Sequence, residues 1–354
     1  MNLLQILKRQ LDTPEKESKA SAYPVYAQLK ERWLVPVSQP MILTSEIQRS
    51  GGTLLSQLLD GHPECFAHPY EIKWGRPEKW DWPNISSIMH KHSLKIFKRI
   101  DEKWLDTFAQ DGYYKKVSGW QDSEKYPFIF DRELQKSLFQ KLMEKAPPQS
   151  QREVLNYYLS SIFNAWLDYQ HLYNRNKKFV TGFTPRVTMH PESLARFFSD
   201  YPDGYLISLI RHPASWYSSA IKHGYAQYGA IENIMRFWQD SAEASMRVAE
   251  EYGDRAIVLL FEDLVCHTES VIQLICRRTG LSFHATLLEP TFNGIPIHSC
   301  SNYEASYQID QSVVERYRSV LCSNDIEAIE KGYLQTYEKA AFLHSIQTQT
   351  LVTA

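Results

Sequence analysis

Glycine is scarce in this chain, with 14 glycines among 354 residues, fewer than the roughly 7% of an average protein. The one Gly-Gly pair, Gly51-Gly52, is therefore the first place to look for a backbone that curls tightly or approaches a ligand. Cysteine is also rare, with 5 scattered residues. An odd, scattered set argues against a disulfide framework and favours a reducing, cytoplasmic compartment.

Strong net charge and long apolar runs are also lacking. A formal net charge of -2 gives no overall electrostatic case for binding nucleic acid or an anionic membrane. No apolar run reaches the ~18 residues of a transmembrane helix, so we expect no integral membrane segment. The N-terminus, MNLLQILKRQLDTPEKESKA, lacks the apolar core and cleavage site of a secretory signal and is expected to form a short amphipathic helix.

Short apolar runs alternate with helical patterns, which predicts an α/β fold. Strands are predicted over 41–45, 205–210 and 256–261, and helices over the leucines that follow Gly52 and over about 269–279. Gly61 and Pro63 are expected to end the first of these helices, and Gly280 the second. Such alternation favours a mostly parallel sheet that is flanked by helices on both faces.

The predicted domain organisation has three parts, namely an N-terminal helical segment (1–40), a main domain (41–342) and a tail (343–354). Within the main domain, residues of about 76–178 are expected to form a helical insertion over the carboxyl edge of the sheet, which would make the acceptor pocket. Five of the nine tryptophans lie between Trp74 and Trp120, and they are expected to fill its core, with stacking on a sugar as the alternative. The basic stretch 90–104 is interpreted as a solvated helix face, with contact to an anionic acceptor as the alternative.

The segment EIQRSGGTLL (46–55) places a glycine turn between a buried strand and a helix start. Such a turn gathers backbone N–H groups at the positive end of a helix, which predicts a phosphate or sulfate site. Thr53 can cap this helix or contact the ligand. The Walker A pattern fits badly, because Gly52 stands where Lys is required and Glu46 where the first Gly is required. A diphosphate-like group without a metal suits this loop better than a magnesium-bound triphosphate.

Two segments resemble the nucleotide-binding motifs of sulfotransferases. QRSGGTLLSQLLDGHPE is similar to their 5′-phosphosulfate loop, RSGTTLLxxLLxxHP, although Gly52 stands where Thr is frequent. IRHPASWYSSAIKHG resembles their 3′-phosphate segment, RDPRxxxxS, with Arg211 and Ser219 at the matching spacing and His212 in place of Asp. LLFEDLV resembles the strand end YEDLV of the family, and PTFNGIPIHSCSNY (290–303) resembles its late loop over the nucleotide. The matches follow the order of the family from Met41 to about Asn302.

The resemblance implies a P-loop-NTPase-like fold and a donor, 3′-phosphoadenosine 5′-phosphosulfate (PAPS), bound without a metal. Arg49, Arg211 and Ser219 would hold the 3′-phosphate, and the 5′-phosphosulfate would lie on the loop residues Ser50, Gly51, Gly52, Thr53 and Leu54. No lysine matches the loop lysine that some branches of the family use, so that role is left unassigned. The spacing of His62, Cys65 and His68 suits a metal, but no fourth ligand is evident, and zinc is set aside.

A general base for the acceptor is expected just beyond the glycine-loop helix. In several branches of the family a catalytic Glu follows the His-Pro dipeptide by about nine residues, and Glu71 occupies that position, with His68 as the second candidate. An apolar setting beside Tyr70 and Trp74 could raise the pKa of such a carboxylate. The predicted activity is in-line sulfuryl transfer to a hydroxyl or amine of a small-molecule or carbohydrate acceptor. The alternatives are a P-loop kinase with a metal site at Glu262-Asp263, and a non-catalytic nucleotide-binding protein.

Overall fold

The computed structural model describes residues 28–74, 81–102, 105, 113–114, 125–126, 128–174, 176–297 and 309–349. Most of the predicted N-terminal segment (1–27), the part of the late loop from residue 298 to 303, and residues 350–354 lie outside these ranges. Within them, residues 28–32 are helical. None of the helices in the described ranges has the length and apolar character of a membrane span.

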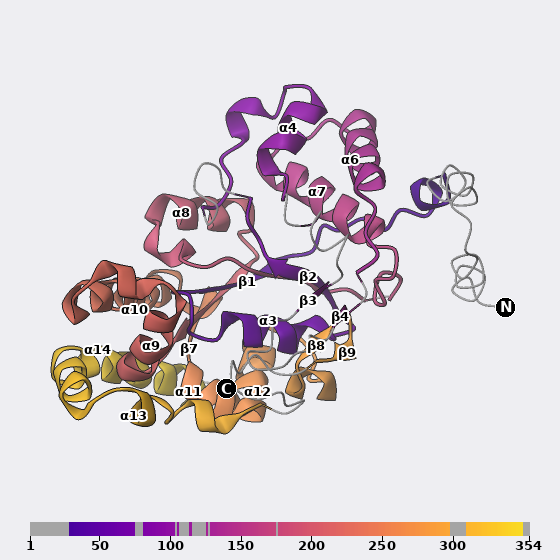
Figure 1. The fold of residues 1–354 in the computed structure, drawn as a ribbon. Helices are drawn as coiled ribbons and strands as arrows, with labels where there is room; N and C mark the ends of the chain where they lie inside the picture. Colours follow the sequence, from indigo (N-terminus) through magenta and orange to yellow (C-terminus); the bar gives the residue numbers. More distant parts are fainter. Residues whose placement is uncertain are drawn as a thin grey trace.

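A five-stranded parallel sheet forms the centre of the molecule (Figure 1). Its order is β2-β5-β1-β6-β7. The strands are β1 (Met41–Glu46), β2 (Cys65–Glu71), β5 (Phe179–Phe183), β6 (Tyr205–Ile210) and β7 (Ala256–Leu260). The prediction of a mostly parallel α/β sheet is confirmed, and the three strands predicted from sequence are observed within one residue of their expected bounds.

Alternate residues of the strands enter two separate hydrophobic cores, as the period of two along a strand requires. Met41 and Leu43 belong to the core shared with α7 (Gln151–Ala165), α8 (Pro191–Asp200) and α10 (Ile231–Tyr252). Ile42 belongs to the core shared with α3 (Gly52–Asp60), α11 (Phe261–Cys266) and α12 (Thr268–Thr279). Both faces of the sheet are therefore covered by helices, which is why almost all residues of these strands are buried.

The remaining described helices complete the two layers. They are α4 (Ser93–Ile100), α6 (Arg132–Lys145), α9 (Pro213–Ala220), α13 (Tyr317–Val320) and α14 (Ser323–Gln349). Short hairpins β3–β4 (Tyr113–Tyr114 and Lys125–Tyr126) and β8–β9 (Thr291–Phe292 and Ile295–Pro296) flank the sheet. Helix α14 packs along β7, α9 and α10. It continues to Gln349, whereas the sequence placed the start of a tail at residue 343.

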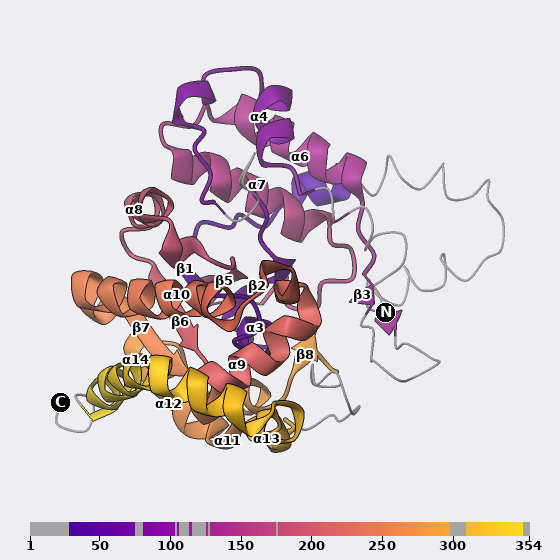
Figure 2. The same ribbon diagram turned by 60° about the vertical axis from the view of Figure 1, so that its left-hand side comes forward.

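In the described part of the predicted insertion, α7 packs on a face of the sheet. In Figures 1 and 2, α6 and α7 stand on the side opposite α3 and α12. Phe163 of α7 packs on Phe66 of β2, with ring centroids 5.2 Å apart. Trp74 and Trp82 are fully buried in the same core, with ring centroids 5.2 Å apart. These two tryptophans therefore fill a core, which is the role expected for the cluster.

The strand order fixes where a ligand can bind. From β1 the chain crosses to β2 at the sheet edge and returns to β5 on one side of β1, and it then continues to β6 on the other side. In open α/β sheets the crevice outside the carboxyl ends of the strands, at such a reversal of direction, is the usual ligand site. The glycine loop begins at this point, directly after Glu46.

Candidate active site

The glycine loop has the backbone of an anion-binding turn. Arg49 (φ 82°) and Gly51 (φ 107°) adopt left-handed conformations, and α3 begins immediately afterwards at Gly52. A Cβ atom added at Gly51 would lie 2.5 Å from the ring of Phe261, so this position has neither the φ nor the space for a side chain. The first backbone N–H groups of α3 have no partners within the helix and lie at its positive end.

The loop is tied to the β6–α9 unit by side chains that bind its carbonyl oxygens. Arg211, at the end of β6, donates from Nη1 to the Arg49 oxygen at 3.1 Å. Trp216 of α9 donates from Nε1 to the Gln48 oxygen at 2.9 Å. These bonds fix the unusual backbone at Arg49, and they couple the two sequence motifs physically.

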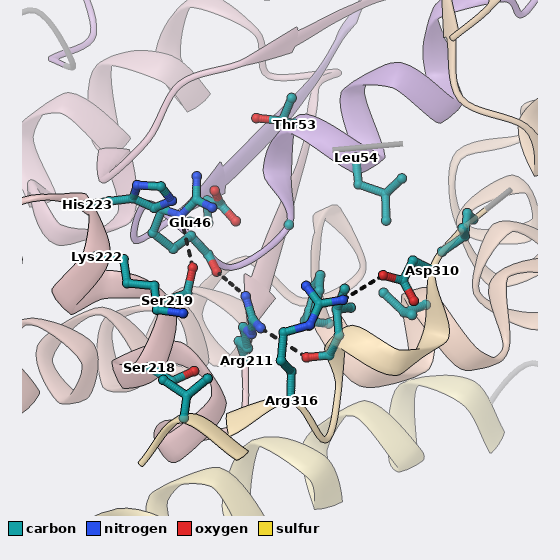
Figure 3. A pocket seen from close by; sticks show the side chains of 17 residues that line it. Glu46, Thr53, Leu54, Arg211, Ser218, Ser219, Lys222, His223, Asp310 and Arg316 are labelled. Carbon is teal, nitrogen blue, oxygen red and sulfur yellow. Dashed lines mark hydrogen bonds and ion pairs between the residues drawn. The ribbon is translucent and has the colours of Figure 1, made fainter. Parts of the chain in front are cut away.

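The two motifs meet at one cavity of about 150 Å³. Arg49 donates from Nε to the Ser219 hydroxyl at 3.1 Å, although 170 residues separate them in the chain (Figure 3). Arg211 also faces the cavity, and its Nε donates to the Ser215 hydroxyl at 2.9 Å. Burial lowers the pKa of Arg211 to about 10, which still leaves the guanidinium charged at neutral pH. The structure therefore brings together Arg49, Arg211 and Ser219, the residues expected to hold the 3′-phosphate.

Further polar residues of this cavity were not selected from the sequence. Lys222 and His223 follow Ser219 by three and four residues in the 3₁₀ turn directly after α9, so helical spacing could have indicated them. Arg316 comes from the segment before α13 and binds Asp310 at 2.7 Å. No sequence pattern near Arg316 connects it with the glycine loop, because only tertiary folding places them together. The cavity thus combines cationic side chains from three parts of the chain.

The other predicted loop residues differ in their placement. Thr53 and Leu54 line the cavity, whereas the Ser50 hydroxyl is fully buried and has no hydrogen-bond partner in the described structure. Gly51 is the N-cap of α3, and no side chain caps this helix, so the expected capping role of Thr53 is wrong. Thr53 instead lines both this cavity and a second, smaller one beside it.

The second cavity, of about 20 Å³, lies at the end of β2. Glu71 and His68 both line it, together with Asp60 of α3 and with Phe183. The register between β2 and β5 shifts between Ala67 and Glu71, and a bulge of this kind re-aims the residue that follows it. Glu71 is partly exposed and pairs with Lys73, with Oε2 and Nζ 3.3 Å apart. Among the described residues of the predicted insertion, none lines either of these two cavities.

His68 is held on both sides of its ring. Its Nδ1 lies 2.8 Å from the Tyr70 oxygen, and its Nε2 lies 3.1 Å from Oε1 of Glu102, with both side chains fully buried. Burial opposes ionisation of Glu102, but its contact with His68 and the hydrogen bonds that it accepts hold the pKa of Glu102 below its usual range. This buried pair fixes the bulge that carries Glu71. His68 is placed to position the strand end, whereas Glu71 keeps access to the cavity.

The neighbours of Gly52 explain why this position has no side chain. A Cβ atom there would lie 2.5 Å from the ring of Phe183 and 2.9 Å from the carboxyl carbon of Glu46. The buried Glu46 side chain and the Phe183 ring therefore leave no space for a side chain at position 52.

We expect Gly52→Ala to destabilise the fold by about 2 kcal/mol, because overpacking a buried site forces its neighbours to move. Gly332→Ala is the matched control, since nothing lies within 4 Å of a Cβ atom added at Gly332 in α14. It should stabilise the helix by about 0.5–1 kcal/mol. Urea unfolding of both variants measures the difference, and equal effects would contradict the steric explanation.

The residues of the two metal-based alternatives are engaged elsewhere. Glu262 accepts bonds from the His212 N–H at 3.0 Å and from the Tyr337 hydroxyl at 2.8 Å, and Asp263 lies 3.3 Å from Nε2 of His344. Glu262 thus binds the backbone N–H of His212, the residue that stands in place of the Asp of the family motif. Within the part of the chain that the structure describes, no group of three or more His, Cys, Asp or Glu side chains is arranged as a metal site.

Together, the fold and this site define an α/β protein with a parallel sheet, a glycine loop at the start of a helix and a cationic cavity. A family model described as the sulfotransferase family matches residues 47–285. The chain belongs to the sulfotransferase family, which confirms the resemblance of its two motifs. Among curated proteins, no sequence matches it.

Solved structures with a similar fold include several sulfotransferases. The sulfotransferase domain of the curacin biosynthetic pathway is 16% identical, with a TM-score of 0.45, over 83% of this chain and 97% of that one. The sulfotransferase domain of the Synechococcus PCC 7002 olefin synthase is 20% identical, with a TM-score of 0.45, over 86% and 96%. A sulfotransferase from Alicyclobacillus acidocaldarius is 14% identical, with a TM-score of 0.38, over 83% and 96%.

Proposed function

We propose that this sulfotransferase uses PAPS as its donor and transfers the sulfuryl group in line to a hydroxyl or amine of a small-molecule or carbohydrate acceptor. The observation that carries the proposal is the convergence of Arg49, Arg211 and Ser219 on the cavity at the glycine loop. Two arginines, a helix N-terminus and nearby Lys222 suit a ligand with more than one anionic group. The neighbouring small cavity with Glu71 suits the acceptor end.

In this proposal, each part of the site has a separate task. The donor supplies an activated sulfuryl group when it is bound. The backbone N–H groups at the start of α3 hold the 5′ end of the donor, while Arg211 and Arg49 neutralise the phosphate charges. Glu71 takes the proton from the acceptor hydroxyl or amine, and Lys73 and the His68–Glu102 pair keep the carboxylate in place. Thr53 lines both cavities and therefore lies between the proposed donor site and the proposed acceptor site.

Calorimetry with 3′-phosphoadenosine 5′-phosphate (PAP), the product nucleotide, tests this proposal. We expect PAP to bind without a metal, and at least ~10-fold more tightly than ATP with magnesium, because a charge-assisted contact to the 3′-phosphate adds about 1.5–3 kcal/mol. Adenosine 5′-phosphate is the matched control, since it lacks only that group, and it should bind about as weakly as ATP. Tighter binding of magnesium ATP than of PAP would instead support the kinase alternative.

A further inference from the structure

Glu46 places a carboxyl group inside the cavity that we assign to the donor. It is the last residue of β1, its side chain is 3% exposed, and it lines the larger cavity (Figure 3). Its Oε2 accepts a hydrogen bond from the Gly52 N–H at 2.6 Å. A buried acidic side chain is unexpected at the binding site of an anion, because a second negative charge there would repel the ligand.

The carboxyl group stands where the side chain of residue 52 would begin. A Cβ atom at Gly52 would lie 2.9 Å from the Glu46 carboxyl carbon. Position 52 is also where the Walker A pattern requires its lysine, and this loop has none. Glu46 therefore reaches from the strand into the space that a side chain at position 52 would need.

The surroundings of Glu46 favour its neutral form. Burial raises its pKa to about 8, although the Gly52 N–H and the arginines Arg49 and Arg211 act in the opposite direction. The nearby Glu71 raises it further. A neutral carboxylic acid has one O–H donor as well as an acceptor oxygen. It can therefore accept the Gly52 N–H and still donate to an anion.

We propose that Glu46 acts as a neutral acid that donates a hydrogen bond to the anionic group held by the glycine loop, in place of the missing loop lysine. This inference rests on the proposed function, since the anion is the phosphate or sulfate of an adenine nucleotide. If the Glu46 carboxyl group is ionised in the protein without nucleotide, it must take up a proton before the nucleotide binds or while it binds. Nucleotide affinity then depends on pH through Glu46.

Few other groups near Glu46 change charge in the relevant pH range. Charged or titratable side chains face it from the loop, β2, β6 and the segment after α9, namely Arg49, Glu71, Arg211, Lys222, His223 and Tyr225. Burial, and then Arg49, lower the pKa of His223. Burial raises the pKa of Tyr225. His223 and Tyr225 are therefore neutral between about pH 7.5 and about pH 9.

The test is calorimetry of PAP binding from about pH 7 to about pH 9, in pairs of buffers with different ionisation enthalpies. For the wild type we expect affinity to fall by up to about tenfold per pH unit above about pH 8, with uptake of close to one proton at about pH 9. Glu46→Gln keeps an acceptor for the Gly52 N–H and an N–H donor for the anion, so its affinity should stay constant without proton uptake. Glu46→Ala should bind PAP about 10- to 100-fold more weakly at pH 7. Glu133→Gln is the matched control, because the Glu133 side chain on α6 is 78% exposed and lines neither of the two cavities, and we expect it to retain the pH dependence of the wild type.

The outcomes separate this inference from the proposed function. If PAP binds but Glu46→Gln keeps the pH dependence and proton uptake of the wild type, the role of Glu46 is wrong while the nucleotide site stands. If the wild type itself takes up no proton at about pH 9, the role is also wrong, and this result does not require any variant to fold. Failure of PAP to bind the wild type at any pH would overturn the proposed function and this inference with it.

Discussion

Glu71→Gln is expected to lower kcat for sulfuryl transfer by about 100- to 10,000-fold, the range that a positioned general base contributes. Glutamine fills the same volume but cannot accept the acceptor proton. Because Glu71 lines the small cavity and not the cationic one, PAP affinity should remain close to that of the wild type. The expected pattern is a large loss in kcat with an unchanged nucleotide Kd, measured by steady-state kinetics and calorimetry.

A matched carboxylate elsewhere provides the control for this prediction. Glu133 on α6 has a side chain that is 78% exposed and lines neither of the two cavities, so Glu133→Gln should leave kcat unchanged. Replacement of His68 by asparagine separates positioning from chemistry. It should lower both kcat and the stability of the fold, since it breaks the buried pair with Glu102. If Glu71→Gln kept full activity while His68→Asn retained stability and lost activity, His68 would be the base and Glu71 would not.

Arg211→Met is expected to weaken PAP binding by at least ~100-fold, because it removes a charge-assisted contact to phosphate and also releases the loop. Arg211 donates to the Arg49 carbonyl oxygen, so its loss frees the left-handed residue that shapes the glycine turn. Arg211→Lys keeps the charge but lacks the planar fork, and an intermediate loss of about tenfold is expected. Calorimetry of PAP binding to the wild type, Arg211→Met and Arg211→Lys measures these differences in affinity.

Arg247→Met on α10 is the control for net charge. Its side chain is 67% exposed and pairs only with Glu243 among the ion pairs of the described structure, so its removal should leave PAP affinity unchanged at moderate salt. An equal loss of affinity in Arg211→Met and Arg247→Met would show that the effect comes from long-range charge and not from contact. A wild-type affinity in Arg211→Met would remove this residue from the proposed site.

Much of the fold could be predicted from local patterns. The strands Met41–Glu46, Tyr205–Ile210 and Ala256–Leu260 each contain a short run of apolar residues, and a helical pattern follows each of them. The strands β2 and β5 were not predicted. In β2, Pro69 and the two polar residues His68 and Glu71 interrupt the apolar run, and the bulge that accommodates them is a tertiary feature. The position of the insertion helices also depends on long-range packing, such as that of Phe163 on Phe66.

Some residues of the candidate site could likewise be predicted from the sequence, and others could not. Arg49, Arg211 and Ser219 could be selected because they match positions in the sulfotransferase motifs that the sequence resembles. Glu46 could be seen only as a departure from the Walker A pattern, because its burial and its contact with the Gly52 N–H require the folded chain. Arg316 lies more than one hundred residues beyond Arg211 and reaches the cavity through the packing of the segment before α13. The small cavity that we propose for the acceptor has a described lining that combines α3, β2, β5 and the β8 strand, so it too requires the folded chain.

Transfer of radioactive sulfate from PAPS to a broad panel of hydroxyl and amine acceptors tests the central proposal most directly. We predict metal-independent labelling of at least one acceptor by the wild type, and a loss of about 100-fold or more in the Glu71→Gln variant. A protein that binds PAP yet labels no acceptor, with Glu71→Gln indistinguishable from the wild type, would contradict this proposal and identify a non-catalytic nucleotide-binding member of the family.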